Sequence, residues 1–181
     1  LTGGTLTLNY ASEIKTGATY EQSGGTLDGP GNLTVQGALG WSGGFIRGSG
    51  EMILASGATG IINGTIYLFD SRTFFNNSTA GLTWTAGNFQ INSPAVFTNN
   101  AGALFDIQTD NDIPGTGTIN NYGTFKKTGI SGETYISSQF NNYGVVDIQT
   151  GSLRLQGTGT NTGTVTTTTG SGTLDFGWAY T

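Results

Sequence analysis

A repeat with a period of about 20 residues constrains this chain more than any other feature of its sequence. The segment SGGTLDGPGNLTV at 23–35 matches SGGFIRGSGEMIL at 42–54, with glycines and aliphatic residues at the same places in both segments. The tetrapeptide Asn-Asn-Tyr-Gly occurs twice, ending at Gly123 and at Gly144, so a similar period separates its two copies. A recurrent spacing of this size is typical of a chain that winds into a solenoid and stacks each turn on the previous one.

One glycine in each repeat marks the period, at a step that is nearly constant and is shortest from Gly64 to Gly81. An aliphatic or aromatic residue stands two positions after eight of the nine marker glycines. The exception is Gly81, where Thr83 holds that position between Leu82 and Trp84, and we expect the register to slip by one residue there. The nine glycines are Gly4, Gly25, Gly44, Gly64, Gly81, Gly102, Gly123, Gly144 and Gly163. The hydrophobic residues that follow them, which stacked turns would bury as a ladder at strand spacing, are Leu6, Leu27, Ile46, Ile66, Leu104, Phe125, Val146 and Val165.

Local patterns predict strands and no helix. Segments such as TLTLNY at 5–10 and SLRLQG at 152–157 are short, mostly alternating, and bounded by Gly, Asn or Ser. Glycine every few residues would also cost a helix about 1 kcal/mol per position. We therefore predict an all-β fold, a single parallel β-helix of about nine coils of 17–21 residues, forming one domain over residues 1–181.

Asparagines near the marker glycines predict a second ladder. Identical amide side chains at equivalent bends of stacked turns can hydrogen-bond to one another along the axis, and Asn tolerates the left-handed conformation of a tight bend. We interpret this pattern as structural, with ligand binding as the alternative. The predicted ladder consists of Asn100, Asn121, Asn142 and Asn161, with the rings of Tyr122 and Tyr143 stacked beside it.

Composition limits the partners that we expect. A net charge of −5 with only six basic residues argues against a nucleic acid or an anionic membrane surface. The chain has no run of about 18 apolar residues, so we expect no membrane insertion. It has no cysteine and no histidine, which removes disulfides, thiolate metal sites and the commonest general base. The opening LTGGTLTLNY lacks the charged start and apolar centre of a signal peptide and begins inside a repeat, so we expect a fragment of a longer repeat protein.

Several repeats resemble those of large secreted bacterial β-helix proteins, the filamentous-haemagglutinin-like and autotransporter-like surface proteins. The resemblance lies in WSGGFIRGSGEMILASGATGII at 41–62, RTFFNNSTAGLTW at 72–84, AVFTNNAGALFDIQTD at 95–110 and FNNYGVVDIQTGSLRLQG at 140–157. It implies a right-handed parallel β-helix, exported and displayed outside the cell as a stalk or adhesive surface. It carries no active-site residues, because the matching positions are glycines, asparagines and core residues.

Asp110-Asn111-Asp112 is the strongest candidate for chemistry in the sequence. Together with Asp106 it offers oxygen ligands for calcium, or a pair of carboxylates for glycoside hydrolysis. The same residues next to Ile113-Pro114-Gly115 also form an ordinary exposed turn, which we favour. We assign no catalytic residue, no metal site beyond the calcium candidate Asp106, Asp110 and Asp112, and no cofactor.

Aromatic and basic residues leave further alternatives open. Trp41, Trp84 and Trp178 could stack on sugar rings along the solenoid, although filling the core accounts for them equally well. The basic residues are interpreted as scattered, solvated charges, with an aligned basic stripe as the alternative. They are Lys126, Lys127, Arg47, Arg72 and Arg154.

The functional expectation is a non-catalytic structural or adhesive module that is secreted or displayed on the cell surface. Its expected partners are other copies of itself, stacked end to end because neither end of the sequence offers an obvious cap, or a host or environmental surface that includes glycans. The alternative is a carbohydrate-binding or carbohydrate-active β-helix that uses surface aromatics and the Asp110/Asp112 turn.

Overall fold

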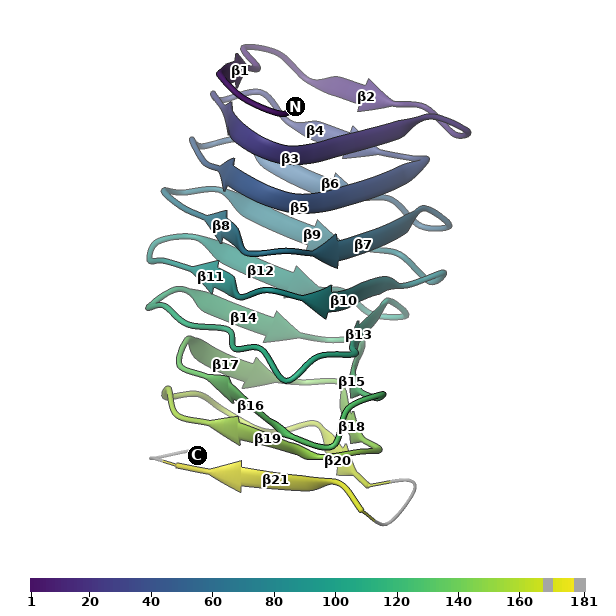
Figure 1. Ribbon diagram of the computed structural model, residues 1–181, viewed down its shortest axis with the longest axis vertical. Coiled ribbons are helices and arrows are strands. Elements are labelled where there is room, and N and C mark those ends of the chain that lie inside the picture. Colours follow the sequence, from purple (N-terminus) through teal and green to yellow (C-terminus); the bar gives the residue numbers. More distant parts are fainter. Residues whose placement is uncertain (168–170, 178–181) are drawn as a thin grey trace.

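The computed structural model describes residues 1–167 and 171–177, and over these residues the chain is a parallel β-solenoid with no helix. Figure 1 shows the strands stacked as rungs along one axis, with β1 and β21 at opposite ends of the rod. As the chain descends, its front strands run to the left and its back strands to the right, which makes the coil right-handed (Figure 1). The prediction of an all-β, right-handed, single-chain β-helix is confirmed.

Three faces surround the core, and within the described residues all strand pairings are parallel. Face 1 contains β2 (Ser12–Ile14), β4 (Leu33–Val35), β6 (Glu51–Leu54), β9 (Thr73–Asn76), β12 (Val96–Asn99), β14 (Thr118–Asn121) and β17 (Gln139–Asn142). Face 2 contains the first half of the long strands β3 (Thr19–Asp28) and β5 (Ala38–Ile46), then β7 (Thr59–Asn63), β10 (Leu82–Ala86), β13 (Leu104–Ile107), β15 (Thr124–Lys127), β18 (Val145–Ile148) and β20 (Thr164–Thr166). Face 3 contains β1 (Thr5–Thr7), the second half of β3 and β5, then β8 (Ile66–Leu68), β11 (Phe89–Ile91), β16 (Glu133–Ile136), β19 (Ser152–Leu155) and β21 (Thr173–Phe176).

Alternation along each strand builds the core. In β6, β15 and β19, as in most four-residue strands of the solenoid, the second and fourth side chains are buried and the first and third are not. The period of two residues directs every second side chain inward. Aromatic rings from different faces pack edge to face in the middle of the rod, for example Phe97 on Phe105 at 5.1 Å and Phe125 on Phe140 at 5.0 Å between ring centroids.

The predicted hydrophobic ladder is right in its first two steps, and the third step has a different partner. Leu6 pairs with Leu27, and Leu27 with Ile46, as the marker glycines predict. Ile46 then pairs with Leu68 and not with Ile66. The intervening turn is two residues longer than predicted, and because side chains alternate, a shift of two residues keeps Ile66 facing inward. Ile66 is accordingly buried, opposite Phe89 in the next turn.

The prediction of about nine coils is wrong by about one, since the solenoid has about eight turns. The glycine series changes face in the middle: Gly64 precedes β8 on face 3, whereas Gly81 precedes β10 on face 2. The residue stacked on Gly64 is Gly87, where a Cβ would lie 2.1 Å from the Gly64 carbonyl carbon. The step from Gly64 to Gly81 therefore covers less than one full turn. The predicted slip of register at Gly81 is confirmed, because Leu82 and Trp84 are both buried.

Close stacking explains why glycine recurs at one corner of the early turns. Gly25 and Gly44 have φ of +63° and +83°, a conformation that L side chains rarely adopt. A Cβ on Gly44 would also lie 2.5 Å from the Gly25 carbonyl oxygen of the turn before it. The corner is therefore formed by backbone packed directly on backbone.

Candidate functional site

An asparagine ladder runs through the buried corner where face 1 turns into face 2. In this ladder each amide nitrogen donates a hydrogen bond to the amide oxygen of the asparagine in the next turn. Asn76 donates to Asn99 at 2.8 Å, Asn99 to Asn121 at 2.8 Å, Asn121 to Asn142 at 2.7 Å, and Asn142 to Asn161 at 2.8 Å. The second hydrogen of each of these amides goes to a backbone carbonyl of the following turn, for example from Asn99 to Thr124 at 3.0 Å. The ladder satisfies polar groups that the corner would otherwise bury unpaired.

The structure places Asn99, and not Asn100, in this ladder. Asn99 pairs with Asn121, so this turn is one residue longer than the sequence repeat predicts. A turn closed by a hydrogen bond from the Ala103 nitrogen to the Asn100 carbonyl supplies the extra residue. Leu104 is consequently partly exposed, and Phe105 takes the core position that the sequence assigned to Leu104. Asn100 instead donates to Asn77 at 2.5 Å, outside the buried column.

The tyrosines lie beside this ladder on the outside of the coil. The rings of Tyr122 and Tyr143 stack with centroids 4.9 Å apart and planes 13° apart. The two residues are 47% and 44% exposed, so each ring has one face against its partner and an edge toward solvent. Asn142, Asn121 and the tyrosines that follow them thus repeat with the period of the coil.

Two of the three tryptophans selected as glycan-stacking candidates lie inside the coil and cannot stack on a sugar ring. Trp41 and Trp84 are fully buried, and their indole nitrogens donate to the carbonyls of Gly43 and Gly87 at 3.1 Å and 2.8 Å. Both rings therefore fill the core, which was the alternative reading of these residues. Trp178 lies outside the described residues.

Asp110 of the calcium candidate is held by the protein's own donors. Its Oδ1 accepts a hydrogen bond from Lys127 Nζ at 2.9 Å, and its Oδ2 accepts one from the Gly132 amide at 3.0 Å. Lys127 is 1% exposed and donates also to the Thr109 carbonyl and the Thr134 hydroxyl, at 2.9 Å and 3.0 Å. The ammonium group thus occupies the position beside Asp110 that a cation would need.

Asp106 and Asp112 are likewise engaged, and they face different partners. Asp106 accepts hydrogen bonds from Gln108 and Thr128, both at 2.8 Å. Asp112 accepts one from the Tyr135 amide at 2.9 Å, which links its turn to β16. Among residues 1–167 and 171–177, no three carboxylates, histidines or cysteines converge in a way that could hold a metal ion.

Two basic side chains are buried, so the prediction of solvated charges is wrong for Arg72 and Lys127. Arg72 lies at the start of face 1, and its guanidinium donates to backbone carbonyls of the two preceding turns. The acceptors are Arg47 at 2.8 Å and 2.6 Å, Gly29 at 3.0 Å, Gly31 at 3.3 Å and Glu51 at 3.4 Å. Burial lowers the pKa of Arg72, and the nearby Asp28 carboxylate acts in the opposite direction. The arginine joins three consecutive turns at one corner.

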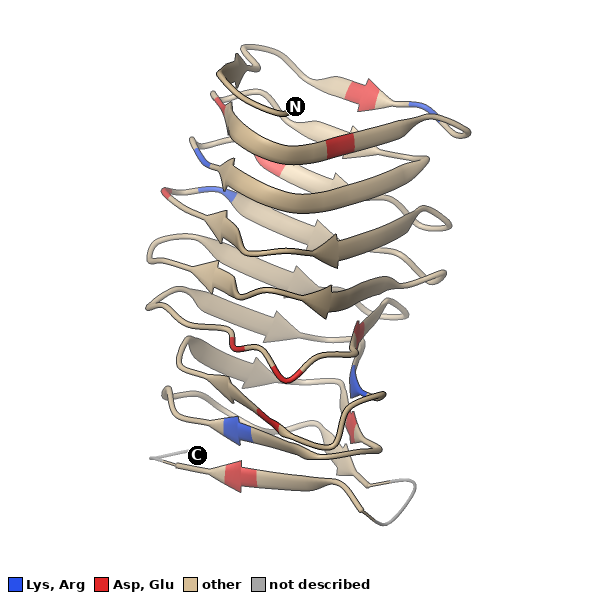
Figure 2. Cartoon of the chain, viewed as in Figure 1, with Lys and Arg blue, Asp and Glu red and all other residues tan. Residues whose placement is uncertain are grey.

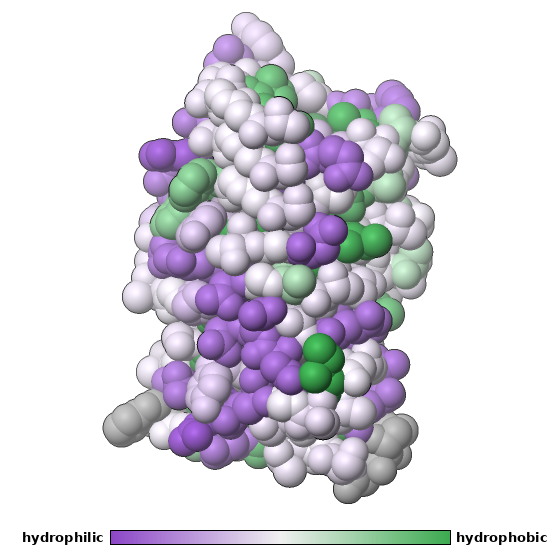
Figure 3. All heavy atoms as spheres, viewed as in Figure 1, coloured by the Kyte–Doolittle hydropathy of each residue, from purple (hydrophilic) through white to green (hydrophobic). Residues whose placement is uncertain are grey.

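The other charged residues are partly or fully exposed, and Figure 2 shows their positions scattered along the rod. Arg47 pairs with Asp70 at 2.9 Å, and Arg154 lies 3.3 Å from Asp175 and 3.9 Å from Glu133. The guanidinium of Arg154 also lies 5.9 Å from the centroid of the Tyr135 ring. The face drawn in Figure 3 is largely of intermediate hydropathy, with scattered hydrophilic and few hydrophobic side chains. This surface obtains its polarity from Thr, Ser, Asn and Gln.

A shallow hollow of about 270 Å³ lies on face 2, across β3, β5 and β7. Small side chains on β5, Ala38, Gly40 and Ser42, form its floor, and Glu21 and Ile61 stand on either side. The Glu21 carboxylate leans over Gly40, where a Cβ would lie within 2.5 Å of its Cδ. The hollow contains one carboxylate and hydroxyl groups, a set that by itself specifies no reaction.

No protein-family model, curated protein or solved structure matches this chain. The fold is therefore assigned from the structure and from the repeat in the sequence. The part of the chain that the structure describes contains no helix of the length and apolarity needed to cross a bilayer.

Proposed function

We propose that this chain is a rigid, non-catalytic rod of an extracellular or cell-surface protein, whose work is reach and the display of side chains to a host or environmental surface. The observation that carries the proposal is the continuous hydrogen bonding along the axis. Backbone ladders join successive turns on three faces, and the asparagine ladder and Arg72 add side-chain bonds in the same direction. Bonds aligned with the axis resist bending and stretching of the rod.

Composition supports placement outside the cell. The chain has only 9% charged residues and a composition rich in Thr, Asn, Ser and Gln. The repeats resemble those of secreted bacterial β-helix proteins, including haemagglutinin-like and autotransporter-like surface proteins, which display such rods. The absence of histidine and cysteine from the sequence also supports a role without catalysis.

Self-association belongs to the same proposal. The strands of the first turn, β1 and β2, and those of the last, β20 and β21, are largely exposed, as are Val165 and Phe176. These strands stand at the ends of their sheets among the described strands, and a strand in that position can accept a further strand. In the 181-residue chain by itself, a second copy would supply that strand. We expect neither a nucleic acid nor membrane insertion among its interactions.

Protease shaving of intact cells of the source organism tests the placement. Peptides from the exposed turns should be released from intact cells and identified by mass spectrometry. If the peptides appear only after lysis, the proposed location is wrong. Sedimentation velocity at increasing concentration tests the stacking, since end-to-end association predicts species that grow with concentration, and a constant monomer excludes it.

A further inference from the structure

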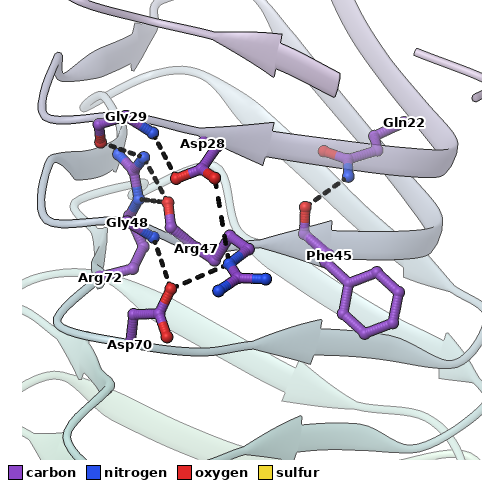
Figure 4. A network of polar contacts seen from close by, with 8 residues as sticks. All are labelled: Gln22, Asp28, Gly29, Phe45, Arg47, Gly48, Asp70 and Arg72. Carbon is purple, nitrogen blue, oxygen red and sulfur yellow. Dashed lines mark hydrogen bonds and ion pairs between the residues drawn. The ribbon is translucent and has the colours of Figure 1, made fainter. Parts of the chain in front are cut away.

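A cluster of aromatic and charged side chains lies at the corner that follows β5 and β8 on face 3. Its members are the aromatic residues Phe45, Tyr67 and Phe69 and the charged residues Asp28, Arg47 and Asp70. They come from three consecutive turns, and the rod-shaped fold as such does not require any of these side chains on its surface. Figure 4 shows the polar part of the cluster, with Arg47 between the two aspartates and the Phe45 ring at its side.

The aromatic part of the cluster presents an open ring. Phe45 is 41% exposed and stacks on Tyr67 at 4.8 Å, and Phe69 stacks against both rings at 5.8 Å and 6.0 Å. In the preceding turn the position equivalent to Phe45 is Thr26, whose short side chain leaves the other side of the ring open. Exposed aromatic faces of this kind pack against the apolar faces of sugar rings.

The polar part of the cluster holds an arginine with its terminal amino groups unused. Arg47 donates through Nε to Asp70 at 2.9 Å, and Asp28 lies 4.0 Å away. The Arg47 side chain is 49% exposed, and Figure 4 draws no contact from its two terminal nitrogens. Asp70 keeps Oδ1 for an outside donor, and Oδ2 of Asp28, which lies 4.0 Å from Arg47 Nε, accepts no hydrogen bond within the described residues.

The backbone beneath these groups is fixed in place. Asp70 is the one described non-glycine residue with positive φ, at +57°, and its carboxylate also accepts the Gly48 amide at 3.2 Å. Arg72 donates a hydrogen bond to the Arg47 carbonyl from inside the coil, and the Gln22 side chain donates one to the Phe45 carbonyl at 3.0 Å. A site whose donors are immobilised before binding loses less entropy when it takes a ligand.

We propose that this corner binds a neutral saccharide, with Phe45 against one face of a sugar ring and Arg47, Asp28 and Asp70 on its hydroxyl groups. Phe45 lies in β5 and Arg47 directly follows this strand. One buried residue, Ile46, separates them, so the two side chains face the same side at a spacing of about 7 Å, which one sugar unit spans. Vicinal hydroxyls donate to carboxylate oxygens and accept from a guanidinium fork in the same plane.

The charge of the cluster points to a neutral ligand. Arg47 and Arg72 offset Asp28 and Asp70, so the site carries no net charge, and the chain as a whole carries −5. A uronic or sialic acid would meet two aspartates, and a cationic ligand would meet the exposed guanidinium of Arg47, since Arg72 is buried. The inference adds a ligand to the display role proposed above, and the rod would remain if the site bound nothing.

The test is an array of neutral oligosaccharides of glucose, galactose, mannose and N-acetylhexosamines with uronic-acid oligomers beside them, followed by calorimetric titration of the neutral probes that bind. Four variants are compared with the parent chain: Phe45→Leu, Arg47→Gln, Arg47→Lys and Arg154→Gln. Arg154 is the matched control, because it lies on the same face, is 40% exposed at its side chain and neighbours an aromatic ring.

We expect binding to a neutral oligosaccharide that weakens at least about tenfold in the first three variants and stays unchanged in Arg154→Gln. Arg47→Lys keeps the charge but loses the planar fork, so unchanged affinity in that variant would refute the recognition of paired hydroxyls. The proposal is also overturned by no neutral binding, by binding of uronic acids alone, or by equal loss in Arg154→Gln. Sedimentation velocity of each variant reports on the rod separately, so a failed site is distinguished from a failed scaffold.

Discussion

Two adjacent asparagines offer a sharp test of the register of the stack. Asn99 is fully buried, accepts a hydrogen bond from Asn76 and donates to the Asn121 side chain and the Thr124 carbonyl. Asn100 is half-buried, and its side chain donates one hydrogen bond, to Asn77. The sequence repeat assigns the ladder to Asn100, and the structure assigns it to Asn99.

The cost of Asn99→Ala follows from these contacts. Three hydrogen bonds are lost at about 1 kcal/mol each, and the amide of Asn76 and the oxygen of Asn121 each lose a partner in the interior. We therefore expect the free energy of unfolding to fall by about 3–5 kcal/mol. Asn100→Ala loses one partly solvated hydrogen bond and should cost about 1 kcal/mol or less.

Urea unfolding followed by circular dichroism measures both variants against the parent chain. The contacts of Asn99 lie in its own turn and the two adjacent ones, so amide hydrogen exchange should also speed up most in the turns that contain Asn76 and Asn121 when Asn99 is replaced. An equal loss of stability in the two variants, or a larger loss in Asn100→Ala, would refute the register that the structure gives to this corner.

Three further substitutions probe the buried polar groups. Arg72→Met removes every side-chain bond to the carbonyls of Arg47 and Gly29, and should lower the stability by about 3 kcal/mol or more in thermal melts, whereas Arg154→Gln should change it by less than about 1 kcal/mol. Lys127→Met should cost about 2–4 kcal/mol because Asp110 and Thr109 lose their donor, and a cost no greater than that of Lys126→Met, on the outside of the same strand, would contradict the buried position. Burial raises the pKa of Tyr20 to about 12, so its contribution to stability is complete below pH 10 and is lost as the pH rises from 10 to 12, by about 2 kcal/mol. Urea midpoints across that range should fall less steeply in Tyr20→Phe than in the parent chain, and parallel curves would rule out this assignment.

The repeat in the sequence predicted the fold class because it reports directly on stacking. Equivalent residues recur at the spacing of the marker glycines in the first turns, and there the structure has the predicted partners, Thr5 with Thr26 and Leu33 with Met52. Alternating short segments then separated strand from helix. Handedness came from the resemblance to other β-helix repeats, since periodicity alone carries no hand.

Turn length is where the sequence prediction failed. One extra residue at Ala101–Gly102 moves the ladder from Asn100 to Asn99, and two extra residues before Leu68 move the core partner of Ile46. Glycine and asparagine recur at every corner, so they mark corners without telling one corner from another. The change of face between Gly64 and Gly81, which raised the predicted number of coils, has the same cause.

The buried charges and the corner cluster could not be predicted from the repeat. Arg72 and Lys127 stand at positions where neighbouring turns carry apolar or polar residues, and only the folded structure brings carbonyls of the two preceding turns around Arg72. Phe45 and Tyr67 alternate with buried residues in β5 and β8, a pattern that marks outward positions once the register is known. The sequence makes the tryptophans candidates for stacking on sugars because their rings are large and flat. In this fold the same large apolar rings place Trp41 and Trp84 in the core.

Distances between spin labels along face 1 test the central claim, that each turn lies directly over the last. The chain has no cysteine, so introduced cysteines can be spin-labelled without background. The label sites are Glu13, Thr34 and Asn120, which face outward in one column, and each double variant carries cysteines at two of them. Five steps of the column separate Glu13 from Asn120 and four separate Thr34 from Asn120. Double electron–electron resonance should give narrow distributions near about 24 Å and about 19 Å, one strand spacing of about 4.8 Å apart. Broad distributions, or a pair of distances that does not differ by one strand spacing, would contradict the stacked solenoid.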